Sequence, residues 1–228
     1  MLVRKYGGSS VASQAQIERI VASLPQPPLV VVLSAPKGRT DALYRNTQAY
    51  IDSEIKNHYI ASGELESCYL LQMALAKQGR ESEIVTYKNL GIYASQMHGG
   101  HIHQCNPLYI QSVLATGKTV IVPGFQAIYE NKLALLKRGG SDDTAVALAI
   151  EMNAKCEIYS DVEGIYQDVG QTYQQVSYQT LLGLIGADEA PMSRSAVLMA
   201  QANQLSICFN HWDEIGNGTE ICTKDQLY

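Results

Sequence analysis

The chain has 228 residues, of which 46% are hydrophobic, and it carries a formal net charge of −5. This length suits one large domain, or one domain with two lobes. Mild acidity without a cluster of Lys and Arg argues against nucleic acid as a partner. No apolar run reaches the length of a membrane span, and the N-terminal segment 1–6 is too short and too charged for a signal peptide.

The five cysteines are scattered along the chain, and no CxxC pair or other metal-site spacing is present. An odd number of cysteines without such spacing favours reduced thiols, several of them buried in apolar runs. We therefore expect a cytoplasmic protein without structural disulfides.

Strand-like and helix-like stretches alternate along the chain. Strands are predicted at 2–6, 29–33, 83–87, 119–123, 156–159, 206–209 and 220–222, and a hairpin at 128–136. Helices are predicted at 13–24, 40–50, 51–62, 64–76, 107–116, 141–153, 177–184 and 193–204. The least regular part is 89–104, which holds three histidines.

This alternation, together with several uniformly apolar strands, predicts an α/β fold. We expect a three-layer helix–sheet–helix sandwich with a mainly parallel central sheet. Loops rich in Gly, Ser and Asp follow several of the strands. Because the carboxyl ends of parallel strands meet at one edge of the sheet, these loops should converge there, where open α/β sheets bind ligands.

Residues 137–144 read Lys-Arg-Gly-Gly-Ser-Asp-Asp-Thr and precede an apolar run. We expect a glycine turn that opens a helix, with Ser141 as N-cap and Asp142 and Asp143 in the first turn. Free amides at such a helix start bind anions, and Arg138 can grip a carboxylate or phosphate with two parallel hydrogen bonds. The alternative is an ordinary capped helix after a glycine turn.

Lys5 stands at the end of the first predicted strand, directly before a turn that contains Gly7, Gly8 and Ser9. A lysine at that edge can reach a phosphate as a point charge. The pattern is not a Walker A loop, because here the lysine precedes the glycines. On its own, a turn of this kind is most often only a turn.

Two further features each have a structural and a functional interpretation. Glu64 stands at the predicted start of the helix 64–76, where its charge would stabilise the helix dipole. The histidines of 98–103, with Cys105 just after them, could ligate a metal. No carboxylate or second cysteine joins them at a recognised spacing. A flexible surface loop or a substrate-side loop is the alternative.

Three segments together resemble the catalytic domain of aspartate kinases, which belong to the amino acid kinase family. Residues 5–11, KYGGSSV, resemble that family's opening K-F-G-G-T-S-V. Residues 138–145, RGGSDDTA, match R-G-G-S-D-x-T-A, and residues 158–166, IYSDVEGIY, resemble I-Y-T-D-V-x-G-I-Y. Weaker matches surround Thr40, Glu64 and Phe125. The resemblance covers residues 1 to about 210 in order.

The resemblance implies a role for each matching residue. Lys5 and Asp142 would be the catalytic residues, with Asp142 positioning Lys5. The transferring phosphoryl group would lie against Gly7, Gly8, Ser9, Gly139 and Gly140. The amino acid would lie against Thr40, Glu64, Phe125, Arg138 and Ser141, with Glu64 on its ammonium and Arg138 on its carboxylate. The nucleoside would lie against Ser160, Asp161 and Tyr166.

The resemblance also implies one catalytic domain over 1–228, with an amino-acid-binding part at about 1–136 and a nucleotide-binding part at about 137–228. Regulatory ACT domains are not expected. The implied co-substrate is ATP with Mg²⁺, without a metal site formed by the protein alone. The implied partners are the amino acid and a second copy of the chain in a homodimer.

The sequence departs from the family pattern in the helical insert between Thr40 and Glu64, which is much shorter than usual, and in two places that would contact ATP. After Tyr166 the family continues T-T-D-P-R, whereas this chain has Gln167-Asp168-Val169-Gly170. The family's G-A-K-V-L-H-P is replaced by a segment, 186–192, that lacks the lysine. Two cations that contact ATP are therefore missing, and Lys137, Lys155 or Arg194 could replace them.

Three functions follow from these observations. The first is ATP-dependent phosphorylation of the side-chain carboxylate of L-aspartate. The second is the same chemistry on another aspartate-like acid, which the short insert between Thr40 and Glu64 and the histidine stretch favour. The third is a ligand-binding or regulatory homologue without turnover, which the missing cations favour.

Overall fold

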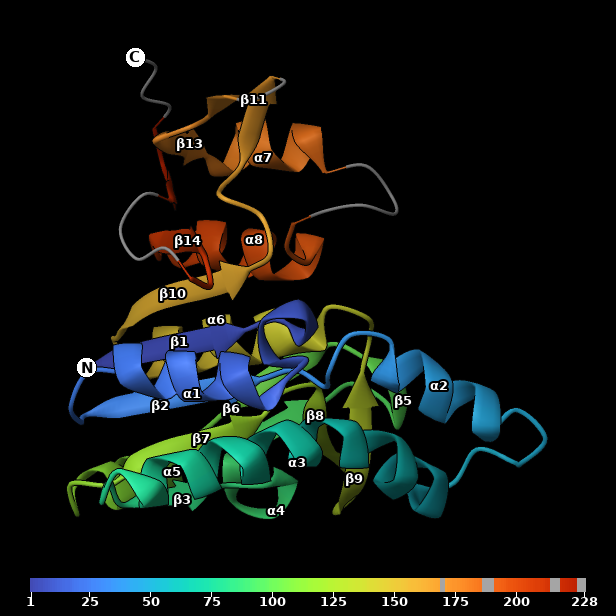
Figure 1. Ribbon diagram of the computed structural model, residues 1–228. Helices are drawn as coiled ribbons and strands as arrows, with labels where there is room; N and C mark the ends of the chain where they lie inside the picture. The colour runs from blue at the N-terminus through green and yellow to red at the C-terminus, as the bar shows by residue number, and fades with distance from the viewer. Residues whose placement is uncertain (169–170, 186–190, 214–217, 225–228) are drawn as a thin grey trace.

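The computed structural model describes residues 1–168, 171–185, 191–213 and 218–224. Its main sheet has eight strands in the order β13-β15-β14-β10-β1-β2-β7-β3 (Figure 1). All neighbouring pairs are parallel except β14 and β15. In chain order these strands are β1 (Leu2–Tyr6), β2 (Leu29–Leu33), β3 (Ser82–Ile84), β7 (Thr119–Pro123), β10 (Lys155–Ser160), β13 (Gln175–Ser177), β14 (Ile207–His211) and β15 (Thr219–Cys222).

Helices cover both faces of this sheet, so the predicted α/β sandwich is confirmed (Figure 1). One face carries α1 (Gln14–Ser23) and α3 (Glu54–Lys77), which pack against each other. The other face carries α6 (Gly140–Glu151), against which α8 (Arg194–Ala202) packs. Because the central strands are covered on both faces, β2 and β7 contain almost only apolar residues and are buried throughout, whereas β1 also carries Arg4 and Lys5.

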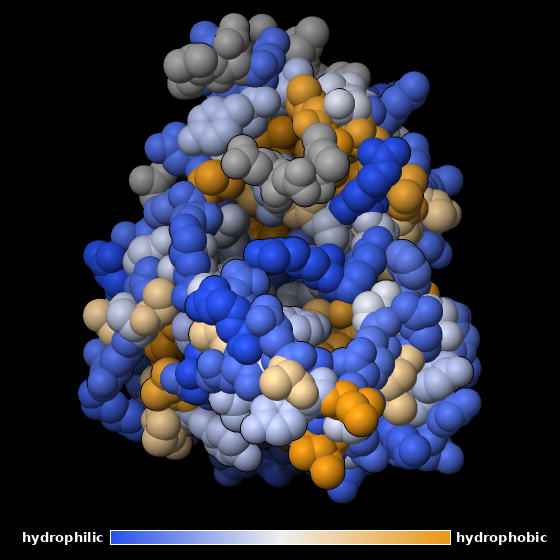
Figure 2. Space-filling view, turned by 90° about the vertical axis from the view of Figure 1, so that its right-hand side faces the viewer, coloured by the Kyte–Doolittle hydropathy of each residue, from blue (hydrophilic) through white to orange (hydrophobic). Residues whose placement is uncertain are grey.

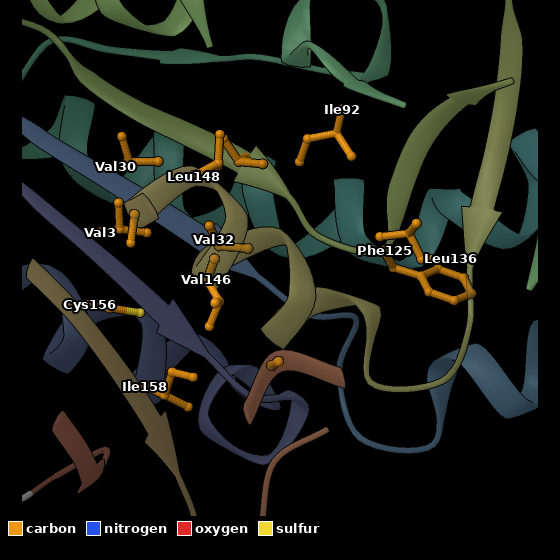
Figure 3. Packing of buried hydrophobic residues seen from close by; sticks show 14 of the residues in the cluster. Val3, Val30, Val32, Ile92, Phe125, Leu136, Val146, Leu148, Cys156 and Ile158 are labelled. Carbon is orange, nitrogen blue, oxygen red and sulfur yellow. The ribbon is translucent and has the colours of Figure 1, made fainter. Parts of the chain in front are cut away.

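The centre of the second face is α6, whose residues from Gly140 to Ala149 are all buried. Figure 3 shows Val146 and Leu148 of this helix beside Val3 and Val32 of the main sheet. A short apolar run at 145–150 was enough to predict a buried helix. Its burial fixes the N-terminus of α6 against the edge of the sheet.

A second sheet of five strands lies beyond α6, in the order β5-β9-β8-β4-β6. Its hairpin, β8 (Gln126–Tyr129) and β9 (Lys132–Leu136), was predicted. The other strands, β4 (Ile92–Ala94), β5 (His98–Gly100) and β6 (Ile102–Cys105), correct the expectation that 89–104 is irregular. They are too short to show a period. β4 and β5 also have partners in distant parts of the chain, β8 and β9, whereas β6 pairs with the nearby β4.

The region 51–76 also differs from the prediction. A single helix, α3, runs from Glu54 to Lys77 and is capped by Ser53, so Glu64 lies in mid-helix and does not open it. Gly63 does not interrupt the helix. A Cβ there would lie 2.9 Å from the Cβ of Ala35, so the glycine allows close packing against the loop after β2.

The remaining elements are short. They are η1 (Gly8–Val11), α2 (Arg39–Asn46), α4 (Tyr87–Leu90), α5 (Leu108–Leu114), α7 (Tyr178–Leu184), and the strand pair β11 (Tyr166–Asp168) and β12 (Gln171–Thr172). Gly38, rather than Thr40 or Asp41, is the N-cap residue of α2. Among the described residues, no helix combines the length and the hydropathy that a membrane crossing requires.

Candidate active site

Loops at the carboxyl ends of β1, β2, β7 and β10 meet the N-terminus of α6 around a cavity of about 660 Å³. Figure 2 looks onto this end of the molecule and shows a hollow among mostly hydrophilic side chains. Most of the predicted site residues line the cavity, namely Lys5, Gly8, Ser9, Thr40, Glu64, Phe125, Arg138, Gly139, Gly140, Ser141, Asp142 and Asp161. The expected convergence of loops at one sheet edge is therefore observed.

A buried ion pair lies in this cavity. Lys5 Nζ is 2.6 Å from Asp142 Oδ1, and the two side chains are only 10% and 7% exposed. Lys5 shares a face of β1 with Val3, which packs in the core around α6, so its side chain points toward the first turn of that helix. A charged pair this well shielded interacts more strongly than a surface pair, because water screens it little.

The glycine turn before α6 differs from the prediction in one respect. Gly139 occupies the N-cap position with φ of 85°, so Ser141 lies inside the first turn and does not cap the helix. A left-handed N-cap of this kind favours glycine. Within this first turn the Gly140 amide donates to the Lys137 carbonyl and the Asp142 amide to the Gly139 carbonyl, each at 2.9 Å. Ser141, whose amide forms no such bond within the described residues, lines the cavity near Lys5, at the helix end that favours anions.

The two glycines after β1 have different roles. The Gly7 amide donates to the Tyr159 carbonyl at 3.0 Å, so it extends the sheet and is not free to bind a phosphate. Gly8 lines the cavity, and a Cβ on it would lie 2.5 Å from the Ala35 carbonyl oxygen. Only glycine therefore allows the first loop to approach the loop after β2.

Glu64 is an isolated carboxylate on the cavity wall. It is 3% exposed, Thr40 Oγ1 lies 3.5 Å from Oε1, and among the described residues Oε2 has no hydrogen-bond partner. Burial raises the pKa of Glu64 to about 7, and hydrogen bonds from the backbone and from Thr40 only partly oppose this. A cationic group placed in the cavity would supply the missing partner.

Phe125 lines the cavity from the tight connection between β7 and β8. Its φ of 69° is rare for a bulky residue, and strain of this kind is often found at ligand sites. The preceding Gly124 lies against Ser141, since a Cβ on Gly124 would be 2.5 Å from Ser141 Oγ. The second sheet is thereby fixed to the start of α6.

Two ion pairs involve residues at the cavity. Arg138 lies 3.5 Å from Asp41, and Lys37 lies 3.4 Å from Asp161. Both basic side chains are largely exposed, so each pair contributes little to stability. Lys37 was not predicted as a site residue, although it stands in the polar loop after β2.

Some predicted residues lie elsewhere. Ser160 and Tyr166 are not among the residues that line the cavity. Lys155 begins β10 and pairs with Leu2, which places it at the opposite edge of the sheet. Lys137 lines the cavity, whereas Arg194 lines a smaller one behind α6.

Residues 169–170 and 186–190, where the family's cations are missing, lie outside the described residues.

The histidine stretch contributes strand β5, and Gly99 lines the cavity, in keeping with a substrate-side position. Within the described ranges, no group of three or more His, Cys, Asp or Glu side chains is placed to hold a metal ion.

A cluster that sequence reasoning missed lies behind the ion pair. Asp143, which is 1% exposed, accepts hydrogen bonds from the hydroxyls of Ser193 and Ser195, each at 2.6 Å. Burial raises its pKa, and these hydrogen bonds oppose the rise. Its partners are 50 and 52 residues away in the chain, so local spacing gives no sign of the contact.

Together these features place buried acidic and basic groups around one cavity, at the carboxyl edge of a parallel sheet. A family model described as the amino acid kinase family matches residues 1–210, and the chain belongs to this family.

The chain is similar to aspartate kinases along nearly its whole length. An aspartate kinase of Pseudomonas putida is 35% identical over 243 residues, which cover 99% of this chain and 59% of the relative. Aspartokinase 2 of Bacillus subtilis is 33% identical over 238 residues, covering 97% of this chain and 58% of the relative. The chain thus spans about three-fifths of the length of these relatives.

Two solved structures share the fold. Aspartate kinase from Synechocystis superposes with a TM-score of 0.82 at 28% identity, covering 99% of this chain and 40% of that chain. E. coli aspartokinase III in complex with aspartate and ADP superposes with a TM-score of 0.84 over 99% of this chain and 65% of that chain. Its identity of 19% is evidence for the fold alone.

The raised pKa of Glu64 predicts a pH-dependent stability. In the unfolded chain this carboxyl has a pKa near 4.5, whereas in the fold it stays protonated up to about pH 7. Stability is therefore lost as pH rises from 4.5 through 7, by at most about 3 kcal/mol. Glu64→Gln, which resembles the neutral form, should match the wild type at pH 4 and exceed its free energy of unfolding at pH 8.

Chemical denaturation at the two pH values measures this difference. Glu66→Gln, an exposed change on the same helix that removes the ion pair with Arg39, is the matched control and should not raise the free energy of unfolding at pH 8. A Glu64→Gln effect that is the same at pH 4 and pH 8 would show that Glu64 keeps an ordinary pKa.

Proposed function

We propose that the protein phosphorylates the side-chain carboxylate of L-aspartate with ATP and yields 4-phospho-L-aspartate and ADP. The observation that carries the proposal is the buried Lys5–Asp142 pair beside the N-terminal amides of α6, which can stabilise a phosphoryl group. The similarity to aspartate kinases, at 33% and 35% identity, supports aspartate as the acceptor.

The amino acid would lie between Glu64 and Arg138. The Glu64 oxygen without a partner suits the substrate ammonium, which would favour the ionised carboxylate. Arg138 would leave Asp41 and take the substrate α-carboxylate. Thr40, Phe125 and Ser141 would complete the wall, since all three line the cavity.

The phosphates would lie against Lys5, Gly8, Ser9, Gly139 and Gly140. The nucleoside would lie toward the loop after β10, where Asp161 lines the cavity, with Ser160 and Tyr166 further out. Mg²⁺ is commonly held by nucleotide phosphates and water with few protein ligands. When bound, Mg²⁺ neutralises charge on those phosphates.

The chemistry asks little of the protein beyond positioning. An oxygen of the aspartate side-chain carboxylate forms a bond to the γ-phosphorus of ATP, and the bond from that phosphorus to the β,γ-bridging oxygen breaks. ADP leaves with the electron pair of the broken bond. The attacking carboxylate is already ionised at neutral pH, so no general base is needed. Lys5 and the amides of α6 would stabilise the charge on the transferring oxygens.

A hydroxamate assay tests this function. The purified protein is incubated with ATP, Mg²⁺, hydroxylamine and L-aspartate, and in parallel with other acidic amino acids. Hydroxylamine traps the acyl phosphate, so the proposal expects aspartyl hydroxamate. If hydroxamate forms only with another acidic amino acid, that acid is the acceptor and the proposed phosphoryl transfer stands. No product from folded protein with any acid would favour a ligand-binding or regulatory homologue.

Arg138→Lys is expected to raise the KM for the amino acid roughly tenfold with a smaller effect on kcat, because a two-bond grip becomes a single contact. Steady-state kinetics at saturating ATP measure this. Arg39→Lys is the control, since Arg39 pairs with Glu66 and does not line the cavity. An unchanged KM in Arg138→Lys would remove Arg138 from the amino-acid site.

We also infer a homodimer, supported by an apolar stripe on α3. Ile55, Tyr59, Tyr69 and Met73 are 82%, 44%, 56% and 60% exposed. Their spacing places them within about 80° of one another around the helix axis. Such a stripe along one helix suits a two-fold contact with the same stripe of a second copy.

We also infer a cytoplasmic location, with which the free state of the described cysteines is consistent.

Tyr69→Glu with Met73→Glu is expected to convert the dimer to a monomer, because it places charges in the contact. Light scattering after size exclusion gives the mass. The same pair of glutamates at Gln78 and Lys88, which lie off the stripe, should leave a dimer. A monomeric wild type, or a dimeric stripe variant, would contradict the assignment.

A further inference from the structure

Two neighbouring carboxylates, Asp142 and Asp143, are buried in the first turn of α6, with exposures of 5% and 1%. The positive end of the helix dipole favours negative charge there. Even so, two acidic groups this close are tolerated in a core only if hydrogen bonds or opposite charges satisfy them. Lys5 is bonded to only one of them.

Ser193 contacts both carboxylates. Its amide donates to Asp142 Oδ2 at 2.9 Å, and its hydroxyl donates to Asp143 Oδ1 at 2.6 Å. The same hydroxyl accepts a hydrogen bond from the Ala196 amide at 3.1 Å, as the N-cap of α8. With a donor and an acceptor role both fixed, the hydroxyl has one preferred orientation.

This arrangement determines where Lys5 points. One oxygen of Asp142 is held by the Ser193 amide, so the other is aimed at Lys5 Nζ. The approach depends on Gly139, because a Cβ there would lie 2.5 Å from the Cβ of Ser193. The N-termini of α6 and α8 are thereby joined at one residue.

We propose that Ser193 is a positioning residue, which holds Asp142 through its amide and Asp143 through its hydroxyl and so aims Lys5 into the cavity. The expected effect of Ser193 on turnover rests on the proposed phosphotransferase function. Its hydrogen bonds to Asp142 and Asp143 do not depend on that function. Ser193 touches neither substrate; it acts through Asp142.

The test compares Ser193→Ala with Ser13→Ala, which removes the N-cap of α1 away from the cavity. Both variants lose a cap, so both should melt at a lower temperature. Only Ser193→Ala should lower kcat, by roughly ten- to a hundred-fold. Loss of the hydroxyl frees the start of α8 from Asp143 and so shifts the retained amide that holds Asp142, and a small misplacement of a phosphate-binding group is costly. Its KM for aspartate should change less than about threefold, since Glu64 and Arg138 are unaffected.

A second pair of variants separates positioning from bulk packing. Asp143→Asn keeps an acceptor oxygen for the hydroxyls of Ser193 and Ser195 and should retain most of the turnover. Asp143→Ala removes that acceptor and should resemble Ser193→Ala. Equal turnover in Asp143→Asn and Asp143→Ala would overturn the proposal, as would a Ser193→Ala kcat equal to that of Ser13→Ala.

Melting temperatures supply a readout that does not need activity. The losses in Ser193→Ala and Asp142→Asn should be less than additive in the double variant, because both break one network. The losses in Ser13→Ala and Asp142→Asn should add. Additive losses in the first pair would overturn the proposal even if wild-type activity were absent. If the wild type has no kinase activity but the melting-temperature losses of Ser193→Ala and Asp142→Asn are less than additive, the proposed function is refuted and the contact network is supported.

Discussion

The buried pair of Lys5 and Asp142 is the constraint on which the rest of the site depends. It joins the carboxyl end of a central strand to the first turn of a buried helix. Removing one partner of such a pair leaves an unpaired charge in the interior, at a cost of about 3–5 kcal/mol. The sheet edge and the helix must therefore keep a fixed relation, which also fixes the loops between them.

Several features of the fold serve this relation. Burial of α6 between the two sheets holds its N-terminus in place, and Gly139 allows α8 to approach it. Gly8 and Gly63 both allow close contact with the loop after β2, at Ala35. The cavity is thus lined by main chain at short distances, and a few polar side chains supply its chemistry. Such preorganised groups suit the stabilisation of a transferring phosphoryl group.

The sequence predicted the parts of the structure whose signals are local. The almost entirely apolar strands 29–33 and 119–123 were correct to the residue, because burial on both faces leaves a continuous run, and strand 2–6 was correct although it contains Arg4 and Lys5. The loop at 137–144 was placed at the site because glycines, a cap and charges occur together. Most of the predicted site residues then met at one cavity.

The missed features depend on partners far away in the chain. Strands β4 and β5 pair with β8 and β9, and Gly63 is tolerated within α3 because Ala35 packs against it. The Gly7 amide was misjudged because its acceptor, Tyr159, is on a distant strand. The contact of Ser193 with Asp142 and Asp143 is of the same kind, and only the folded chain reveals it.

The most direct test of the central claim is the initial rate of aspartyl hydroxamate formation by Asp142→Asn, at saturating ATP and aspartate and beside the wild type. Asn keeps the shape of the side chain and removes the charge that holds Lys5. We expect a rate at least about a hundredfold lower from a protein that melts cooperatively. A rate near that of the wild type would show that the Lys5–Asp142 pair does not organise the site.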